Sequence, residues 1–248
     1  MALHHARVAA LGILSFLGLS AGAEASYSET WNDPGAGANR WYYFQAGAPD
    51  NGDVPLAWTA SGGVDPAPSG FVSADLGAAT TWTPTGAGNY FLAYTYRSHH
   101  PLDLTLAPWA EIALKDGGGL DLGGGTLRFW IGDFDDPNGP NPPAATYSFF
   151  YLDLPLAYGT AGWVTNSIDT TAYSWVQFAN QNGRPVGDLL SDPQQWGIGL
   201  FGAADTPGGT LALDNFIPSP APLALIALGL AGLGWTRRRA PLALTAAA

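Results

Sequence analysis

The side chains that most often serve as catalytic bases and nucleophiles are scarce in this chain. Cysteine is absent, and of the four histidines only His99 and His100 lie beyond residue 25. The sequence has no Gly-x-Ser-x-Gly elbow, no His-Glu-x-x-His zinc motif and no phosphate-binding loop. We therefore predict that the protein is not an enzyme. A carboxylate pair that cleaves glycosidic bonds has no fixed sequence spacing, so a polysaccharide-acting hydrolase stays open as an alternative.

The densest acidic stretch covers residues 132–139, Gly-Asp-Phe-Asp-Asp-Pro-Asn-Gly. Its spacing is similar to that of a calcium loop, but Pro137 stands at the fifth ligand position of such a loop. Ala144 stands where an EF-hand has its bidentate glutamate. An EF-hand is therefore excluded, and we expect a solvated hairpin connection.

Tryptophan side chains are the strongest indication of a ligand. An indole ring packs against the apolar C–H side of a sugar ring, while neighbouring polar side chains bond the sugar hydroxyls. Tryptophans inside predicted strands, such as Trp130 and Trp196, are expected in the core. Four others fall in predicted loops or at strand edges and are candidates for carbohydrate binding: Trp41, Trp58, Trp82 and Trp109.

Short strand-like segments separated by Gly, Pro, Asn and Asp follow one another through the middle of the chain. No amphipathic helical stretch interrupts them, although residues 186–194 have room for one helical turn. Many short strands without intervening helices predict an all-β sandwich. The predicted strands cover residues 56–60, 70–74, 90–96, 112–115, 126–131, 147–154, 162–168, 174–178, 196–201 and 210–216.

Composition and charge narrow the class of protein. Charged residues make up only 12%, and 33 glycines and 20 prolines give a turn-rich chain whose many aromatic residues argue against disorder. Removing Glu24 from the 20 acidic residues, and Arg7 with the three C-terminal arginines from the nine basic ones, leaves a body charge near −14. Nucleic acid and anionic lipid are therefore not expected as partners. Without cysteine, an exported domain must rely on its core or on bound metal.

The first 25 residues have the pattern of a secretory signal peptide. Arg7 supplies a positive start, residues 8–19 are apolar, and Ala23-Glu24-Ala25 forms a small-x-small cleavage site before Ser26. A retained N-terminal anchor fits less well because the apolar segment is short. We therefore expect export through the inner membrane and cleavage before Ser26.

The C-terminal segment combines a proline-stiffened spacer, a short apolar run and a cluster of positive charge. Residues 223–235 carry no charge and precede Arg237, Arg238 and Arg239. The run is shorter than the roughly 20 residues that a spanning helix prefers, but bilayer thinning and snorkelling arginines accommodate this length. The positive-inside rule keeps the arginines cytoplasmic and the body on the far side. The alternative is a buried helix of a soluble domain.

This tail resembles the PEP-CTERM sorting signal of Gram-negative bacteria, in which a Val-Pro-Glu-Pro-Ala/Ser motif precedes a Gly/Leu-rich helix and an arginine cluster. The motif corresponds to Ile217, Pro218, Ser219, Pro220 and Ala221. Ser219 replaces the glutamate of the motif, and the extension over residues 240–248 is a second departure. The resemblance implies recognition by exosortase, a membrane cysteine protease that removes the tail and releases the body or transfers it to the cell surface. It also implies a bacterium that makes exopolysaccharide.

The body resembles laminin domain IV-like and galactose-binding-like jelly rolls. Residues 123–131 match their Gly-Gly-Thr-Leu-aromatic strand, and residues 196–202 and 209–216 match their last two strands, which end in Leu-Asp-Asn-aromatic. The first and last strands of a jelly roll lie side by side, so the resemblance implies that Glu29 and Asp214 meet. Calcium takes six to eight oxygen ligands, so these carboxylates and loop carbonyls would hold a structural calcium ion. The alternative is that Asp214 bonds loop amides and Glu29 is solvated.

Together these features predict four segments. They are a signal peptide over residues 1–25, a jelly-roll body over 26–216, a sorting tail with a transmembrane helix over 217–239, and a cytoplasmic extension over 240–248. We expect a cell-surface or extracellular-matrix protein of an exopolysaccharide biofilm that binds carbohydrate. Its expected partners are exosortase, the inner membrane as a transient anchor, and extracellular polysaccharide. A secreted hydrolase and a purely structural matrix protein are the alternatives.

Overall fold

The computed structural model describes residues 29–31, 40–45, 54–65, 69–78, 90–135, 146–180 and 183–219. The predicted signal peptide, Trp82 and all residues after Ser219, including the predicted transmembrane tail, lie outside these ranges. Among the residues inside them, no helix has the length and apolar character needed to cross a membrane.

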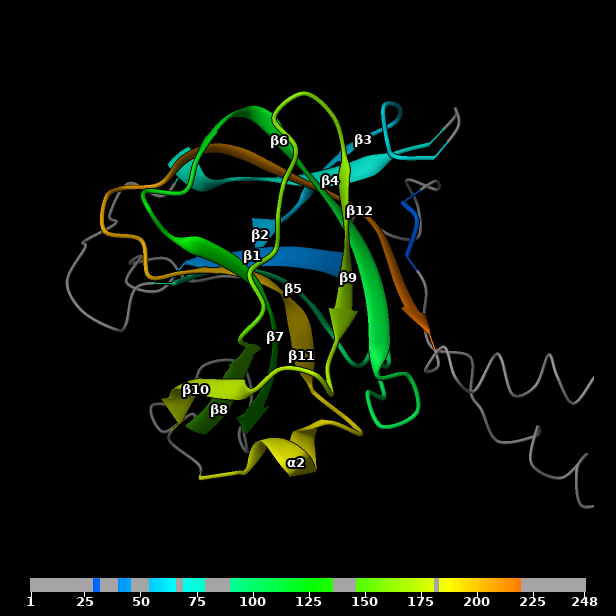
Figure 1. Ribbon diagram of the computed structural model, residues 1–248, viewed down its shortest axis with the longest axis vertical. Helices are drawn as coiled ribbons and strands as arrows, with labels where there is room; N and C mark the ends of the chain where they lie inside the picture. Colours follow the sequence, from blue (N-terminus) through cyan, green and yellow to red (C-terminus); the bar gives the residue numbers. More distant parts are fainter. Residues whose placement is uncertain are drawn as a thin grey trace, which may run out of the picture.

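Two antiparallel sheets form a β-sandwich of the jelly-roll class, which confirms the predicted all-β fold (Figure 1). The seven-stranded sheet has the order β10-β8-β7-β11-β5-β1-β2, and the five-stranded sheet has the order β3-β4-β12-β6-β9. The strands are β1 (Trp41–Gln45), β2 (Val54–Pro55), β3 (Ala57–Thr59), β4 (Phe71–Asp75), β5 (Tyr90–Tyr96), β6 (Trp109–Asp121), β7 (Thr126–Asp135), β8 (Thr146–Leu152), β9 (Val164–Asp169), β10 (Trp175–Asn180), β11 (Gln195–Phe201) and β12 (Gly208–Ser219).

The described residues include two short helical elements. The 3₁₀ turn η2 (Leu76–Ala78) follows β4, and the single-turn helix α2 (Val186–Leu189) precedes β11. The position of α2 agrees with the one helical turn that the sequence predicts there.

The last strand, β12, runs through the centre of the five-stranded sheet between β4 and β6. It continues three residues beyond the predicted end of the body, because Ile217, Pro218 and Ser219 pair with β6. The first three residues of the predicted sorting motif therefore belong to the folded sheet. At the same end of β12, the amide of Glu29 donates to the carbonyl of Phe216 at 2.8 Å, so the N-terminal segment lies beside the last strand.

The core between the sheets is built around large aromatic side chains. Trp41 makes edge contacts with Trp31 and Trp196, with ring centroids 5.4 and 5.2 Å apart, and Trp196 packs on Phe216 at 4.4 Å. All four rings are fully buried. Trp41, expected in a loop as a sugar-binding residue, is instead a core residue on β1, and its ring has no exposed face to offer a ligand.

Candidate functional site

The seven-stranded sheet is apolar on the face that points away from the five-stranded sheet. Along β7, Leu127, Phe129 and Ile131 join the core between the sheets, whereas Trp130 belongs to a separate cluster on the opposite face, as the alternation of side chains along a strand requires. We call this cluster the outer aromatic face. It consists of Tyr42, Phe44, Leu92, Tyr94, Tyr96, Trp130, Tyr147, Phe149, Tyr151, Phe178, Ala179 and Phe201.

Two glycines of β11 allow the rings of the outer aromatic face to lie directly over the backbone of that strand. Gly197 stands between Tyr94 of β5 and Trp130 of β7 in the strand register. Because Gly197 has no side chain, these rings meet across it at 6.0 Å. Gly199 has the ring of Phe201 in the place of a side chain, since a Cβ there would come within 2.6 Å of that ring.

The outer aromatic face has a buried centre and a partly exposed surround. Trp130 and Tyr94 are buried, while Tyr42, Tyr96, Tyr147 and other members are partly buried. Tyr42 lies 6.1 Å from Tyr94 and 5.7 Å from Tyr96, so neighbouring tyrosines support one another's orientation. Tyrosine combines an apolar ring with a hydrogen-bonding hydroxyl, which suits a surface that contacts an amphipathic ligand.

Arg128 and Asp153 add a polar edge to the outer aromatic face. The Arg128 guanidinium packs over the Tyr151 ring at 4.9 Å and forms an ion pair with Asp153. Stacked rings with hydrogen-bonding groups at their border are the arrangement that binds sugar rings, because the rings take the apolar C–H side and the polar groups take the hydroxyls.

A second feature of interest is the buried carboxylates of Glu29, in the first described segment, and Asp214, on the last strand. Glu29 Oε1 accepts a hydrogen bond from the Trp31 amide at 2.8 Å. Asp214 Oδ2 accepts one from the Val64 amide at 2.5 Å, and its Oδ1 accepts one from the Asn215 amide at 2.8 Å. Asp214 thus bonds a loop amide, as the alternative interpretation of the sequence expects, but Glu29 is buried instead of solvated.

Burial makes both of these carboxylates reluctant to ionise. Burial raises the pKa of Asp214 to about 6, and the nearby Asp65 carboxylate acts in the same direction, against the hydrogen bonds from Val64 and Asn215. Burial also raises the pKa of Glu29, and the charge of Asp214 contributes to that rise.

Several oxygen atoms lie around Asp214. Trp31 and Asn215, which follow the two acids, have positive φ angles of 46° and 49°. A Cβ at Gly63 would lie 2.5 Å from Asp214 Oδ2, Ser69 Oγ and the Gly70 carbonyl oxygen, so oxygen atoms crowd this place. Within the described residues no cluster of three or more acidic, His or Cys side chains could hold a metal. Further ligands to calcium would therefore be carbonyl and hydroxyl oxygens, which calcium accepts.

The other tryptophans predicted to bind carbohydrate do not join the outer aromatic face. Trp58 packs against the core between the sheets, and its Nε1 donates to the Trp31 carbonyl at 2.9 Å, which fastens the N-terminal segment. Trp109 is the first residue of β6 and pairs with Ser219 and Asp169 in the five-stranded sheet. Trp82 lies outside the described residues.

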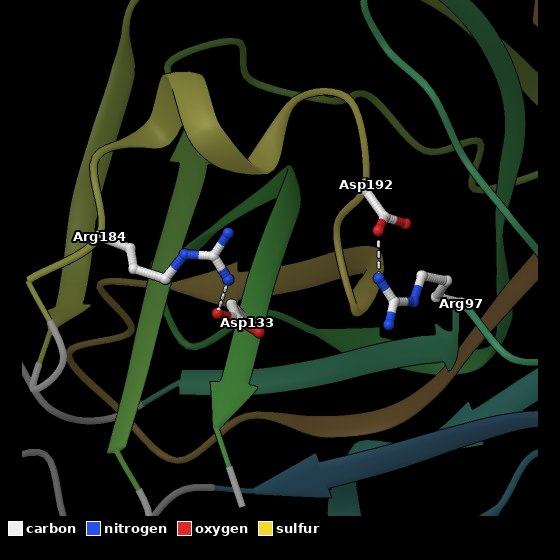
Figure 2. Close-up of polar contacts among 4 residues, drawn as sticks. All are labelled: Arg97, Asp133, Arg184 and Asp192. Atoms are coloured by element: carbon white, nitrogen blue, oxygen red, sulfur yellow. Dashed lines mark hydrogen bonds and ion pairs between the residues drawn. The ribbon is translucent and has the colours of Figure 1, made fainter.

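Two acidic side chains near one end of the sandwich form ion pairs. Asp133 is buried on β7 and pairs with Arg184, which precedes α2, while Arg97 after β5 pairs with Asp192 (Figure 2). These pairs join the segment around α2 to the seven-stranded sheet. Asp133 thus has a structural partner; residues 136–145 of the acidic stretch lie outside the described residues.

Comparison with known proteins gives similarities at the level of solved structures. No protein-family model matches the chain, and no curated protein sequence matches it. The chain is similar to the family 11 carbohydrate-binding module of the cellulosomal cellulase Lic26A-Cel5E of Clostridium thermocellum, with 13% identity and a TM-score of 0.46 over 80% of this chain and 97% of the module.

A second structure of the family 11 module from Clostridium thermocellum, in complex with a β-1,3-1,4-mixed-linked tetrasaccharide, gives 13% identity and a TM-score of 0.46 over 79% of this chain and 99% of that one. The mannan-recognising module TmCBM27 gives 14% identity and a TM-score of 0.34 over 77% and 94%. The jelly-roll assignment rests on the strand pairing described above, and the ligands of these modules are properties of those proteins.

The raised pKa of Asp214 predicts how stability depends on pH in the metal-free protein. The folded state holds this proton more tightly than the unfolded state, whose ordinary value is 3.8. Stability should therefore rise as the pH falls from about 6 to about 4, by at most about 3 kcal/mol, and stay level above the folded pKa.

Thermal unfolding between pH 7.5 and pH 4.5 in the presence of EDTA measures this dependence of stability on pH. The Asp214→Asn variant should lose most of the rise, while Asp205→Asn, which removes an exposed carboxylate, should keep it. A melting temperature that decreases steadily as the pH is lowered in all three proteins would contradict the raised pKa of Asp214.

Proposed function

We propose that this chain is an exported, tail-anchored surface protein whose jelly-roll body binds polysaccharide on the outer aromatic face. The observation that carries the proposal is the continuous group of partly exposed tyrosines around a buried aromatic centre, on the sheet face that the second sheet does not cover. A polysaccharide presents a row of ring faces, which a surface with several partly exposed tyrosine rings can contact over several sugar units.

Charge favours a neutral polysaccharide over an acidic one. The predicted body has a net charge near −14, counted from the 20 acidic and nine basic residues of the chain less those of the two ends. This charge repels uronate-rich or sulfated chains at low salt. Arg128, which borders the outer aromatic face, is already paired with Asp153.

Binding is better supported than hydrolysis. Glycosidases place two carboxyl groups about 5 to 9 Å apart on either side of the scissile bond. At the outer aromatic face the bordering carboxylate of Asp153 is held by Arg128. Glu29 and Asp214 are buried, and Asp214 lies in the other sheet. A purely structural matrix protein remains the second alternative, and it would bind no sugar.

The proposal for the two ends of the chain follows the sequence. Residues 1–25 direct export, and the tail from Ile217 to Arg239 holds the body at the inner membrane until exosortase removes it, as the PEP-CTERM resemblance implies. Ile217, Pro218 and Ser219 are paired in β12, so Pro220 and Ala221 are the first motif residues beyond the strand. The released body would then act at the cell surface or in an exopolysaccharide matrix.

We also propose a structural calcium ion held by Glu29 and Asp214. Both carboxylates are buried and their pKa values are raised, so a divalent cation would offset the cost of keeping them ionised. A metal that binds only the folded state stabilises it by about 2.7 kcal/mol at a hundredfold excess over Kd. This stabilisation would act in a chain that has no disulfide.

Substitution of the partly exposed tyrosines should weaken polysaccharide binding. Tyr42→Ala and Tyr96→Ala each remove a ring worth about 0.5–1.5 kcal/mol beyond its buried area, so each should lower affinity at least several-fold. Binding of the full chain is measured on a panel of neutral and acidic polysaccharides, together with a reducing-end assay for turnover. Tyr173→Ala, an exposed tyrosine outside this face, is the matched control.

Tyr42→Phe keeps the ring and should keep most of the affinity, which separates stacking from misfolding. The proposal fails if no polysaccharide on the panel binds, or if Tyr173→Ala weakens binding as much as Tyr42→Ala does. Release of reducing ends would favour the hydrolase instead.

The arginine cluster should decide retention and processing of the tail. Neutral replacement of Arg237, Arg238 and Arg239 removes the cytoplasmic stop but leaves the apolar run intact, so export should continue while retention and cleavage fail. Intact-mass analysis of cell-associated and released protein reads this out, with three neutral substitutions in residues 240–248 as the control. Unchanged processing of the arginine variant would mean that the charge cluster is incidental.

Chelation tests the calcium ion. At pH 7.5, EDTA should lower the melting temperature of the unmodified protein by several degrees, and calcium should restore it. Asp214→Ala should melt lower in calcium and show no response to the chelator. Glu111→Ala, at an exposed acid of the same sheet, should respond like the unmodified protein. A chelator-insensitive melting curve of the unmodified protein would remove the site.

A further inference from the structure

Exposed apolar side chains gather at one end of the sandwich. The described residues include four large hydrophobic side chains with high exposure: Leu106 at 56%, Tyr173 at 43%, Val54 at 38% and Ile217 at 36%. Val54 lies on β2, at the edge of the seven-stranded sheet. The other three lie close to the end of β12.

The strand register places the end of β12, the start of β6 and the end of β9 next to one another. Ser219, the last residue of β12, pairs with Trp109, which pairs with Asp169 at the end of β9. The Thr170 amide and hydroxyl both donate to the Pro108 carbonyl at 2.9 Å, which ties the two flanking turns together. Figure 1 shows β9 and β12 ending on the same side of the molecule.

Leu106 precedes Trp109 by three residues and Tyr173 follows Asp169 by four, so they lie in the turns before β6 and after β9, which is separated from β12 by β6. Ile217 lies on β12 itself, opposite Glu111. We call Leu106, Trp109, Tyr173 and Ile217 the exit rim.

The chain leaves the sandwich at the exit rim toward its longest uncharged apolar segment. That segment starts at Leu223, four residues after Ser219, and four residues span at most about 14 Å. When the tail is in a bilayer, the exit rim is therefore within reach of the headgroup region. Tryptophan and tyrosine favour this region because one part of the ring system is apolar and the other forms hydrogen bonds.

Charges near the exit rim indicate which lipid it fits. The Asp103 carboxylate accepts hydrogen bonds from Thr105 and the Leu106 amide, and the Asp169 carboxylate accepts them from Thr171 and the Ala172 amide. The predicted body is strongly acidic overall. An anionic surface would repel this end, whereas a zwitterionic one would not.

We propose that the exit rim rests in the headgroup region of a zwitterionic phospholipid bilayer while the tail is attached. This inference rests on the proposed tail anchoring. Contact through the exit rim fixes the orientation of the body relative to the membrane. It also leaves the outer aromatic face, which belongs to the other sheet, open to polysaccharide.

The chain has no cysteine, so single labels report this contact directly. Leu106→Cys and Tyr173→Cys carry a nitroxide label in the full chain, reconstituted into phosphatidylcholine nanodiscs, and Val54→Cys is the matched control. Labels at 106 and 173 should show several-fold higher accessibility to oxygen, which partitions into lipid, than the label at 54. The difference should persist at high salt because the contact is apolar.

Two failures are distinguishable. If the protein co-purifies with nanodiscs but labels at 106 and 173 are as water-exposed as the label at 54, the exit rim is refuted and the anchoring stands. If the protein does not associate with nanodiscs at all, the tail does not anchor it, and both proposals fall. Melting curves of the labelled proteins verify that each variant is folded.

Discussion

The seven-stranded sheet carries large apolar side chains on both of its faces, while the five-stranded sheet covers only one of them. On the covered face Trp196 meets both Trp41 and Phe216 in the core. On the other face Trp130 and Tyr94 must be shielded from water by neighbouring rings, since exposed apolar area costs about 25 cal/mol per Å². Gly197 makes this possible by letting those two rings meet. The result is a rigid aromatic surface whose tyrosines remain partly accessible.

The two-sided character of this sheet explains what the sequence could and could not predict. Residues 90–96 form β5 with the predicted bounds, and the all-β class follows from the density of turn residues. The strand β1 was not predicted, because Trp41-Tyr42-Tyr43-Phe44 has aromatic side chains on both faces and therefore lacks polar alternation. The same unbroken aromatic run was the available signal of an outer apolar face.

Trp41 and Trp58, two of the four tryptophans predicted to bind carbohydrate, instead pack in or against the core. A large indole at a strand edge serves the core as readily as it serves a ligand, and Trp41 and Trp58 are used to bury and fasten the N-terminal segment. The approach of Glu29 to the last strand follows from the jelly-roll resemblance. The residues around Asp214 include Val64, Ser69 and Gly70, which come from the loop between β3 and β4. Only the folded chain brings that loop to Asp214.

The outer aromatic face is the surface proposed to receive the polysaccharide. The most direct measurement follows the ring NMR signals of isotope-labelled tyrosines. An oligosaccharide fragment of a polysaccharide that binds is titrated into the protein. Signals of Tyr42, Tyr94, Tyr96, Tyr147 and Tyr151 should move and saturate together, while those of Tyr43, Tyr158 and Tyr173, which lie outside this cluster, should stay in place. Saturable shifts confined to the second group would contradict the account.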